Sequence, residues 1–194
     1  MIEVLLTYDH ELFYYLNSLG NNRWDDFWLF VTNKFSFIPL YLVLLFLIYK
    51  KLGIKKTLMI MLLVGAMITS TDQLANLFKH LFVRPRPCQP GIFEEAIRFI
   101  APRCGRYGYF SAHAASSMAL AFFVGLLLKK HFKYLFLILV IWSLLVSYSR
   151  IYVGVHYPLD ILTGMVIGAG IGYLYFLLLN FIVNHFPSSV DINK

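Results

Sequence analysis

The sequence predicts an all-α integral membrane protein: a helical bundle of five to six spans, with an N-terminal interfacial helix or extra span. Of its 194 residues, 59% are hydrophobic and 14% are charged, whereas soluble domains carry about a quarter charged residues. The mean hydropathy is +0.69. Too few polar side chains remain to cover a soluble globule of this size, which excludes a soluble enzyme and a disordered chain.

Five apolar segments have the composition of membrane spans, which need about 20 apolar residues or somewhat fewer. We expect spans at 35–49, 57–78, 110–128, 134–149 and 161–184. The first of them can begin upstream, at 24–31. Residues 2–19 are apolar but carry ionisable side chains, among them Asp9, a candidate cap of a short helix that Gly20 would end. We expect this segment to lie in the membrane interface, with a sixth span as the alternative.

The length fits one domain, residues 1–194, in which 1–33 form N-terminal helices and 83–109 form a long loop. A loop of this length in a compact bundle is usually functional. It holds five arginines and both cysteines of the chain, Cys88 and Cys104. The cysteines either close the loop as a disulfide, which requires an oxidising compartment, or remain free thiols. The N-terminus lacks the basic region of a cleaved signal peptide.

The last expected span carries Gly164, Gly168 and Gly172 at intervals of four residues. Such a stripe lets another helix approach closely. That helix belongs either to the same chain or to a second copy, so a homodimer through this face is one interpretation. No other protein partner is indicated. The net charge is +7, and the basic residues lie between apolar runs. This placement favours phosphate or anionic lipid over nucleic acid as the partner.

Charge alone does not orient the bundle. Seven lysines lie in the connections on one side, and Lys79, Arg150 and five loop arginines lie on the other. The lysines occupy two tight turns, whereas the arginines gather with histidines. We therefore place the lysine turns in the cytoplasm and the loop 83–109 outside, across a bacterial inner membrane; a disulfide would agree with this orientation.

The ionisable residues at the span ends on the arginine side form a set that fits phosphate chemistry. Lys79, Arg86 and Arg150 can surround a dianion. Ser111 opens the third span, where free backbone N–H groups and the helix dipole favour an anion. Boundary and intramembrane ionisable groups are costly and often functional.

Two histidines and a carboxylate complete this set. His156 and Asp160 are four residues apart and share a face if the turn is helical. A carboxylate bonded to one ring nitrogen fixes the tautomer and makes the other nitrogen a better nucleophile. His113 can then protonate the leaving oxygen and activate water. The reaction that fits is phosphoryl transfer through a phosphohistidine.

Other interpretations of these residues account for less. An anionic-lipid patch explains the arginines but not the histidines. A metal site of His113, His156 and Asp160 would place a divalent ion beside three cations, which repel it, so we expect no metal and no cofactor. Asp72, Asn76 and Lys79 share one helical stripe; we interpret it as a polar seam, or as a counter-ion for the lysine, rather than as a substrate contact.

Three spaced motifs resemble those of the type-2 phosphatidic acid phosphatase family. Lys79, six further residues and Arg86-Pro87 resemble the first motif. Residues 110–113, Phe-Ser-Ala-His, resemble the second, usually Pro-Ser-Gly-His. Ser149-Arg150, five residues, His156, three residues and Asp160 resemble the third. Their order and spacing agree with the family over residues 79–160.

The resemblance implies a metal-independent helical lipid-phosphate phosphatase. It makes His156 the nucleophile, Asp160 the residue that orients it and His113 the general acid. The phosphate-binding residues it implies are Lys79, Arg86, Ser111, Ala112 and Arg150. Phe110 and Ala112 depart from the motif: Ala112 keeps its N–H but must adopt an ordinary backbone conformation. Vanadium haloperoxidases share the motifs, so oxidation chemistry is a distant alternative.

The substrate is expected to be a membrane lipid, since the site lies at the span ends and is reached from the bilayer. Undecaprenyl diphosphate, cleaved to undecaprenyl phosphate and phosphate, is the first expectation, because small members of the family often resemble its recycling phosphatases. Phosphatidylglycerol phosphate and lipid A phosphate follow, with phosphotransfer to another lipid as a variant. The non-enzymatic alternative is an anionic-lipid-binding scaffold.

Overall fold

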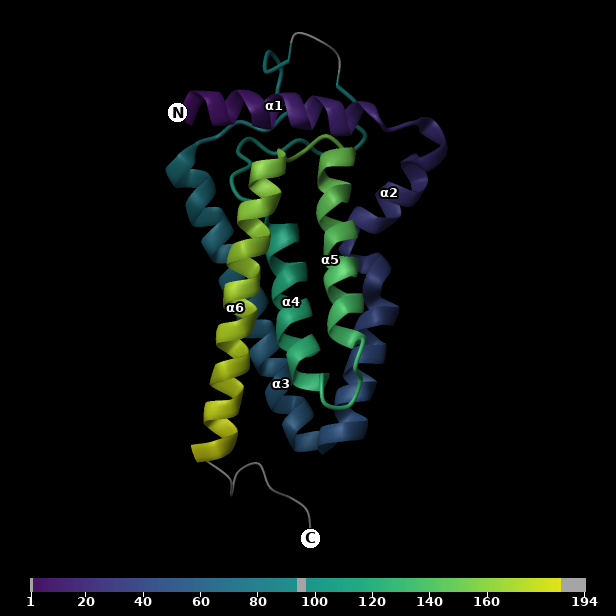
Figure 1. Ribbon diagram of the computed structural model, residues 1–194, viewed down its shortest axis with the longest axis vertical. Helices are drawn as coiled ribbons and strands as arrows, with labels where there is room; N and C mark the ends of the chain where they lie inside the picture. Colours follow the sequence, from purple (N-terminus) through teal and green to yellow (C-terminus); the bar gives the residue numbers. More distant parts are fainter. Residues whose placement is uncertain (1, 94–96, 186–194) are drawn as a thin grey trace.

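The computed structural model describes residues 2–93 and 97–185. One helix, α1, lies across one end of a bundle whose longer helices run roughly along a common axis (Figure 1). In chain order the elements are α1 Ile2–Ser18, η1 Asn22–Trp24, α2 Asp25–Thr32, η2 Lys34–Phe37, α3 Ile38–Phe82, α4 Ala112–Leu128, α5 Leu135–Tyr152 and α6 Pro158–His185. The predicted all-α membrane bundle is confirmed.

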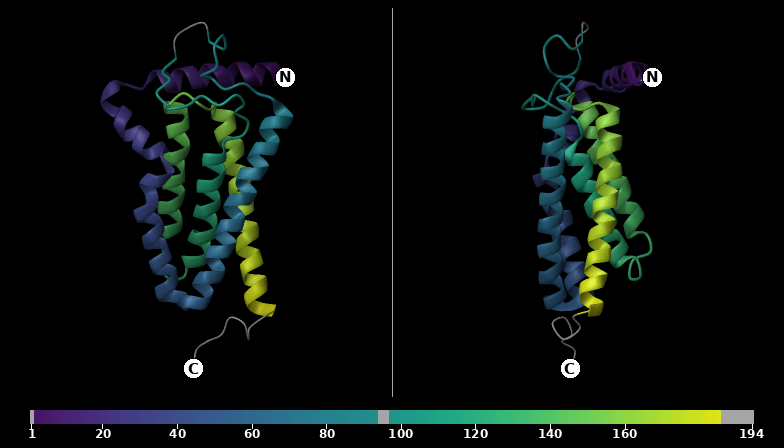
Figure 2. Two further views of the ribbon diagram at one scale, coloured as in Figure 1. Left: turned by 180° about the vertical axis from the view of Figure 1, so that it is seen from behind. Right: turned by 90° about the vertical axis from the view of Figure 1, so that its left-hand side faces the viewer.

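The five expected spans are all helical, and the first two are joined in α3. Gly53 interrupts α3 with a φ of 77°, and the helix turns back there into a second arm (Figure 2). This conformation suits glycine because a Cβ would be strained at positive φ. Stretches long and apolar enough to cross a membrane are Lys34–Phe82, Leu135–Tyr152 and Pro158–His185, and Ala112–Leu128 is a shorter apolar helix.

The N-terminal segment corrects two expectations. The upstream extension of the first span is wrong, because Asn33 is extended (φ −84°, ψ 115°) and separates α2 from the following helices. Asp9 is not a cap either: it lies in the middle of α1 and is buried. Helix α1 is not among the helices apolar and long enough to span, and its position across the bundle end is that of an interfacial helix (Figure 1).

The glycine stripe of α6 packs inside the chain, which excludes the homodimer interface suggested for it. Gly164, Gly168 and Gly172 are buried. A Cβ added at Gly168 would lie 2.2 Å from the carbonyl oxygen of Ala115 on α4, one at Gly172 would lie 2.4 Å from that of Ala119 on α4, and one at Gly164 would lie 2.6 Å from that of Ser111, the N-cap residue of α4. The stripe therefore brings α6 against the backbone of α4, close enough to fix where the first turns of the two helices lie.

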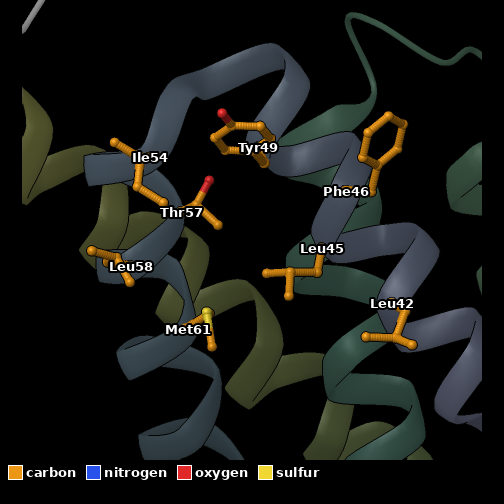
Figure 3. A pocket seen from close by; sticks show the side chains of 8 residues that line it. All are labelled: Leu42, Leu45, Phe46, Tyr49, Ile54, Thr57, Leu58 and Met61. Atoms are coloured by element: carbon orange, nitrogen blue, oxygen red, sulfur yellow. The ribbon is translucent and has the colours of Figure 1, made fainter.

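Helix α4 is the central element, and ten of its residues are buried. Polar pairs fix its neighbours: Ser117 meets Ser143 of α5, and Ser116 meets Thr71 of α3, each with oxygens 2.8 Å apart. A groove of about 300 Å³ lies between the arms of α3, beside the turn at Gly53 (Figure 3). Its lining is apolar apart from Thr57 and the Tyr49 hydroxyl, so it offers no group for phosphate chemistry.

Candidate active site

The candidate active site lies at the end of the bundle covered by α1. The loop 83–109, the turn between α5 and α6 and the first turn of α4 meet there (Figures 1 and 2). His156 and Asp160, both buried, form its centre: Nδ1 of His156 lies 3.2 Å from Oδ2 of Asp160. The backbone N–H of Tyr157 donates to the same oxygen at 3.1 Å. This geometry places the proton on Nδ1 and leaves Nε2 as the free nitrogen.

The turn between α5 and α6 brings Arg150 next to His156. The carbonyl oxygen of Arg150 accepts hydrogen bonds from the backbone N–H groups of Val155 and His156, at 3.1 and 3.3 Å. Gly154 makes this turn with a φ of 83°, and a Cβ there would lie 2.4 Å from the carbonyl oxygen of Arg98. The spacing of Arg150 and His156 in the sequence is thus the length of one tight turn.

The loop holds Arg86 against the turn. Pro85 and Tyr107 form an antiparallel bridge, and the Nε–H of Arg86 donates to the carbonyl oxygen of Tyr107 at 3.0 Å. Cys88 and Cys104 are joined by a disulfide in the same part of the loop. The backbone on both sides of Arg86 is therefore restrained, so its guanidinium has a defined position.

Two polar atoms in the site are buried without a protein hydrogen-bond partner in the part of the chain that the structure describes. They are the Oγ of Ser111 and the Nε of Arg150. Among the described residues, the guanidinium of Arg150 donates one hydrogen bond, from NH1 to the hydroxyl of Thr32 on α2. Buried polar groups are costly unless they are paired, and the oxygens of a bound phosphate would supply acceptors for both.

The N-terminus of α4 supplies further donors. The carbonyl oxygen of Ser111 accepts the first helical hydrogen bond, from Ala115, while its side chain makes no capping bond. The N–H groups of Ala112 and His113 therefore have neither a helical acceptor nor a side-chain cap. Ala112 begins the helix and does not have a positive φ, as expected for its replacement of glycine.

Lys79 and His113 complete the set. Lys79 lies within electrostatic reach of Arg86 and Arg150, and His113 lies within reach of Arg86, Arg150 and His156. The structure therefore brings the predicted residues into one site. Lys79 also donates to Oδ1 of Asn76 at 3.4 Å, and Asp72 lies exposed on the same stripe, within electrostatic reach of the lysine.

The electrostatics favour a neutral His156. Burial lowers the pKa of His156 well below its usual value of about 6.5. Repulsion from Arg86, Arg150 and Lys79 lowers this pKa further, while a hydrogen bond with the backbone of Gly108 acts in the opposite direction. An unprotonated ring is the form that can attack phosphorus.

Sequence reasoning missed two residues of the site, Asp9 and Arg84. Arg84 lies between two carboxylates: NH1 is 2.8 Å from Oδ1 of Asp160, and NH2 pairs with Oδ2 of Asp9. Arg84 was counted only among the loop arginines. His10 on α1 stacks on the ring of Tyr157 with centroids 4.7 Å apart. The one feature of the sequence that could have indicated Arg84 is its position two residues before Arg86.

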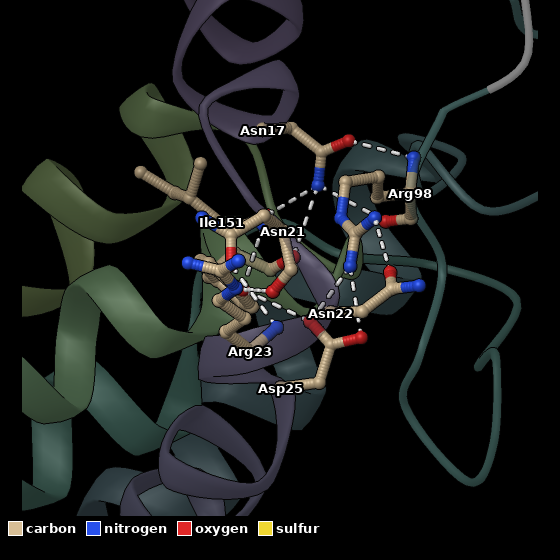
Figure 4. A network of polar contacts seen from close by, with 8 residues as sticks. Asn17, Asn21, Asn22, Arg23, Asp25, Arg98 and Ile151 are labelled. Atoms are coloured by element: carbon tan, nitrogen blue, oxygen red, sulfur yellow. Dashed lines mark hydrogen bonds and ion pairs between the residues drawn. The ribbon is translucent and has the colours of Figure 1, made fainter.

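The remaining loop arginines do not gather at the site. Arg98 pairs with both carboxylate oxygens of Asp25 at 2.7 and 2.8 Å. Its backbone N–H donates to Asn17 on α1, as Figure 4 shows. Arg103 and Arg106 are exposed. Within 2–93 and 97–185, no three His, Cys, Asp or Glu side chains are grouped to hold a metal ion.

Comparison with known proteins identifies the class to which this chain belongs. Residues 57–183 match the PAP2 superfamily. The lipid A 4'-phosphatase of Bacteroides thetaiotaomicron is 33% identical over 181 residues, which are 92% of this chain and 80% of that protein. The undecaprenyl-diphosphatase of Sulfolobus acidocaldarius is 34% identical over 133 residues, 69% of this chain and 58% of that protein.

Solved structures agree with these sequence matches. LpxE of Aquifex aeolicus superimposes with a TM-score of 0.66 at 26% identity, covering 86% of this chain and 93% of the other. The phosphatidylglycerolphosphate phosphatase of Bacillus subtilis gives a TM-score of 0.67 at 18% identity, with 94% and 88% covered, and shares the fold.

The chain belongs to the PAP2 superfamily. It is an enzyme, a lipid phosphatase embedded in the membrane by its apolar helices.

Proposed function

We propose that the enzyme removes a phosphate from lipid A, at the 4' position, on the outer face of a bacterial inner membrane. The observation that carries this substrate is the extent of the similarity to the Bacteroides lipid A 4'-phosphatase. That similarity covers 92% of the chain, so it includes most of residues 1–56, which lie before the region of the family match. Helix α1 and the buried Asp9 belong to this N-terminal part.

Undecaprenyl diphosphate, the substrate first expected from the sequence, becomes the second candidate. The undecaprenyl-diphosphatase match covers 69% of the chain, against 92% for the lipid A enzyme. A second lipid A 4'-phosphatase, from Porphyromonas gingivalis, is 32% identical over 90% of the chain. The lipid A phosphate, one of the alternatives from the sequence, therefore has the better support.

The proposed first step is in-line attack by Nε2 of His156 on phosphorus. The bond from phosphorus to the sugar oxygen breaks, and His113 donates a proton to that oxygen. Asp160 accepts the Nδ1 proton of His156 as a hydrogen bond throughout, at 3.2 Å in the free enzyme. The bond between Nε2 and phosphorus gives a phosphohistidine.

The proposed second step is hydrolysis of this intermediate. His113, now unprotonated, takes a proton from water, and the resulting oxygen nucleophile displaces Nε2 from phosphorus. Inorganic phosphate leaves, and both histidines return to their starting forms. The step needs no electron acceptor and no second substrate other than water.

The phosphate oxygens are bound by the cations and by the start of α4. Lys79, Arg86 and Arg150 neutralise the equatorial oxygens of a loose transition state. The Oγ of Ser111 and the Nε of Arg150, both buried and unpaired among the described residues, donate to them, together with the N–H of Ala112. Preorganised donors of this kind are usually the largest single contribution to the rate.

The test is phosphate release by the purified enzyme in detergent, with lipid A, undecaprenyl diphosphate and phosphatidylglycerol phosphate offered in parallel and a chelator present. We expect the fastest release from lipid A, no effect of the chelator, and loss of turnover in His156→Ala with the fold retained. Turnover by that variant near the wild-type rate would contradict the assignment of His156 as the nucleophile. Faster release from undecaprenyl diphosphate would contradict the proposal that lipid A is the substrate.

A further inference from the structure

Asp9, on the buried face of α1, bonds to groups of the catalytic centre. Its carboxylate is buried, with the residue 6% exposed. Oδ1 accepts the backbone N–H of Leu159, in the first turn of α6, at 2.7 Å. Oδ2 pairs with NH2 of Arg84. A carboxylate this deep in a helix of mostly apolar side chains is costly unless both oxygens are paired, and here both are.

Arg84 continues the connection to the nucleophile. NH1 donates to Oδ1 of Asp160 at 2.8 Å, and Oδ2 of Asp160 lies 3.2 Å from Nδ1 of His156. The guanidinium also lies over the ring of Tyr157, 4.1 Å from its centroid. Asp9, Arg84, Asp160 and His156 thus form one uninterrupted series of charged and hydrogen-bonded groups.

The geometry points to Asp9 as a positioning residue for the nucleophile, acting through Arg84 on Asp160; this rests on the proposed role of His156. A planar guanidinium binds carboxylates with a fixed fork of donors. Asp9 holds NH2, so only NH1 is directed at Asp160. Without the charge of Asp9, Arg84 turns both donors to Asp160 and draws that carboxylate away from Nδ1 of His156. Nε2 then no longer points at phosphorus.

Asp9→Asn tests this assignment, with Glu11→Gln as the matched control. Both changes remove one negative charge from α1, but Glu11 is exposed. The amide of Asp9→Asn retains an oxygen for the N–H of Leu159 and loses the charge that holds Arg84. We expect kcat to fall roughly 10- to 100-fold, the range found when a hydrogen-bonding partner that orients a metal-ligating histidine is changed. KM should stay within about twofold, because Asp9 lies outside the phosphate-binding set.

A double-mutant comparison tests the route through Arg84. If Asp9 acts through Arg84, the variant Asp9→Asn/Arg84→Gln loses no more kcat than Arg84→Gln alone. If the two residues act independently, the losses multiply. Multiplied losses, or a kcat of Asp9→Asn equal to that of Glu11→Gln, would overturn the inference. A fall in the amount of folded protein with unchanged kcat would also overturn it, since that is the result of a purely structural contact.

A measurement without substrate separates this inference from the proposed function. Ring ¹⁵N spectra of His156 in the free enzyme report which nitrogen carries the proton. We expect one tautomer, protonated on Nδ1, in the wild type and in Glu11→Gln, and a mixture in Asp9→Asn. Identical spectra would refute the role of Asp9. Absence of phosphate release by the wild type from every lipid would instead refute the proposed function, with the spectra still deciding on Asp9.

Discussion

Gly108 lies beside His156 and Asp160 and beside Arg86, so replacing it with alanine should impair the reaction without unfolding the protein. A Cβ at Gly108 would lie 3.1 Å from Oδ2 of Asp160, 3.2 Å from Cγ of Arg86 and 3.6 Å from Nδ1 of His156. Ordinary contacts of a Cβ begin at 3.4 Å, so Asp160 must retreat by at least about 0.3 Å, since packed interiors do not absorb such overlaps freely.

The size of the effect follows from the hydrogen bond that this movement weakens. The distance between Nδ1 of His156 and Oδ2 of Asp160 is 3.2 Å. Lengthening it by about 0.3 Å reaches the limit of a hydrogen bond. A hydrogen bond to a charged group contributes about 1.5–3 kcal/mol, which corresponds to a fall in kcat of roughly 10- to 150-fold if the bond serves mainly the transition state.

The assay compares the steady-state kcat for phosphate release by Gly108→Ala with that of Gly170→Ala. An added Cβ at Gly170 meets nothing within 4 Å, so this control should keep wild-type turnover. The thermal midpoints of the two variants should agree within a few degrees. A Gly108→Ala enzyme with the kcat of the control would refute the reasoning, because the pair of His156 and Asp160 would then tolerate the displacement or contribute nothing.

Three further outcomes are expected. Gly168→Ala should lower the thermal midpoint, because its Cβ would lie 2.2 Å from a backbone oxygen of α4 and overpacking costs about 1–3 kcal/mol; an unchanged midpoint would contradict this. Reduction of the disulfide between Cys88 and Cys104, 16 residues apart, should lower the free energy of unfolding by about 3 kcal/mol by the loop-entropy estimate. It should also raise KM, since the same loop carries Arg86. An unchanged KM would show that the disulfide does not position Arg86. In the substrate-free enzyme the ring of His156 should titrate below pH 6.5, since burial and neighbouring cations lower its pKa. Arg86→Gln should raise that pKa, because it removes one of these cations. A pKa of His156 at or above 6.5, measured by NMR of the ring, would contradict the direction of the shift.

The spans and the motif residues could be predicted from the sequence because each depends on local information. A bilayer demands long apolar runs, and these are visible without a partner. The spacing of Arg150, His156 and Asp160 is set by one turn and the first turn of a helix, so it survives in the sequence as a pattern. The glycine stripe of α6 predicted close packing for the same reason, although the pattern does not say that α4 is the partner.

Asp9 and Arg84 could not be found in this way. Their pairing joins positions 75 residues apart, and no periodicity connects α1 with the loop. Local rules instead make a carboxylate near the start of a short apolar segment a cap. Whether Asp9 is a cap or part of a buried ion pair depends on which elements pack against α1, and that is a property of the folded bundle.

The docking of α1 also sets the order in which the enzyme becomes competent. This helix precedes α5 and α6 in the chain, yet several of its polar contacts are with them: Asn17 donates to the carbonyl oxygens of Ile151 and Tyr152 on α5, and Asp9 accepts the backbone N–H of Leu159 on α6, 150 residues further on. At about 5–20 residues per second, roughly 8 to 30 s separate the two ends of that last contact. Until α5 and α6 have been synthesised, α1 lacks these partners and Asp160, in the first turn of α6, is absent, so the nascent chain has no assembled catalytic centre with which to attack membrane lipids.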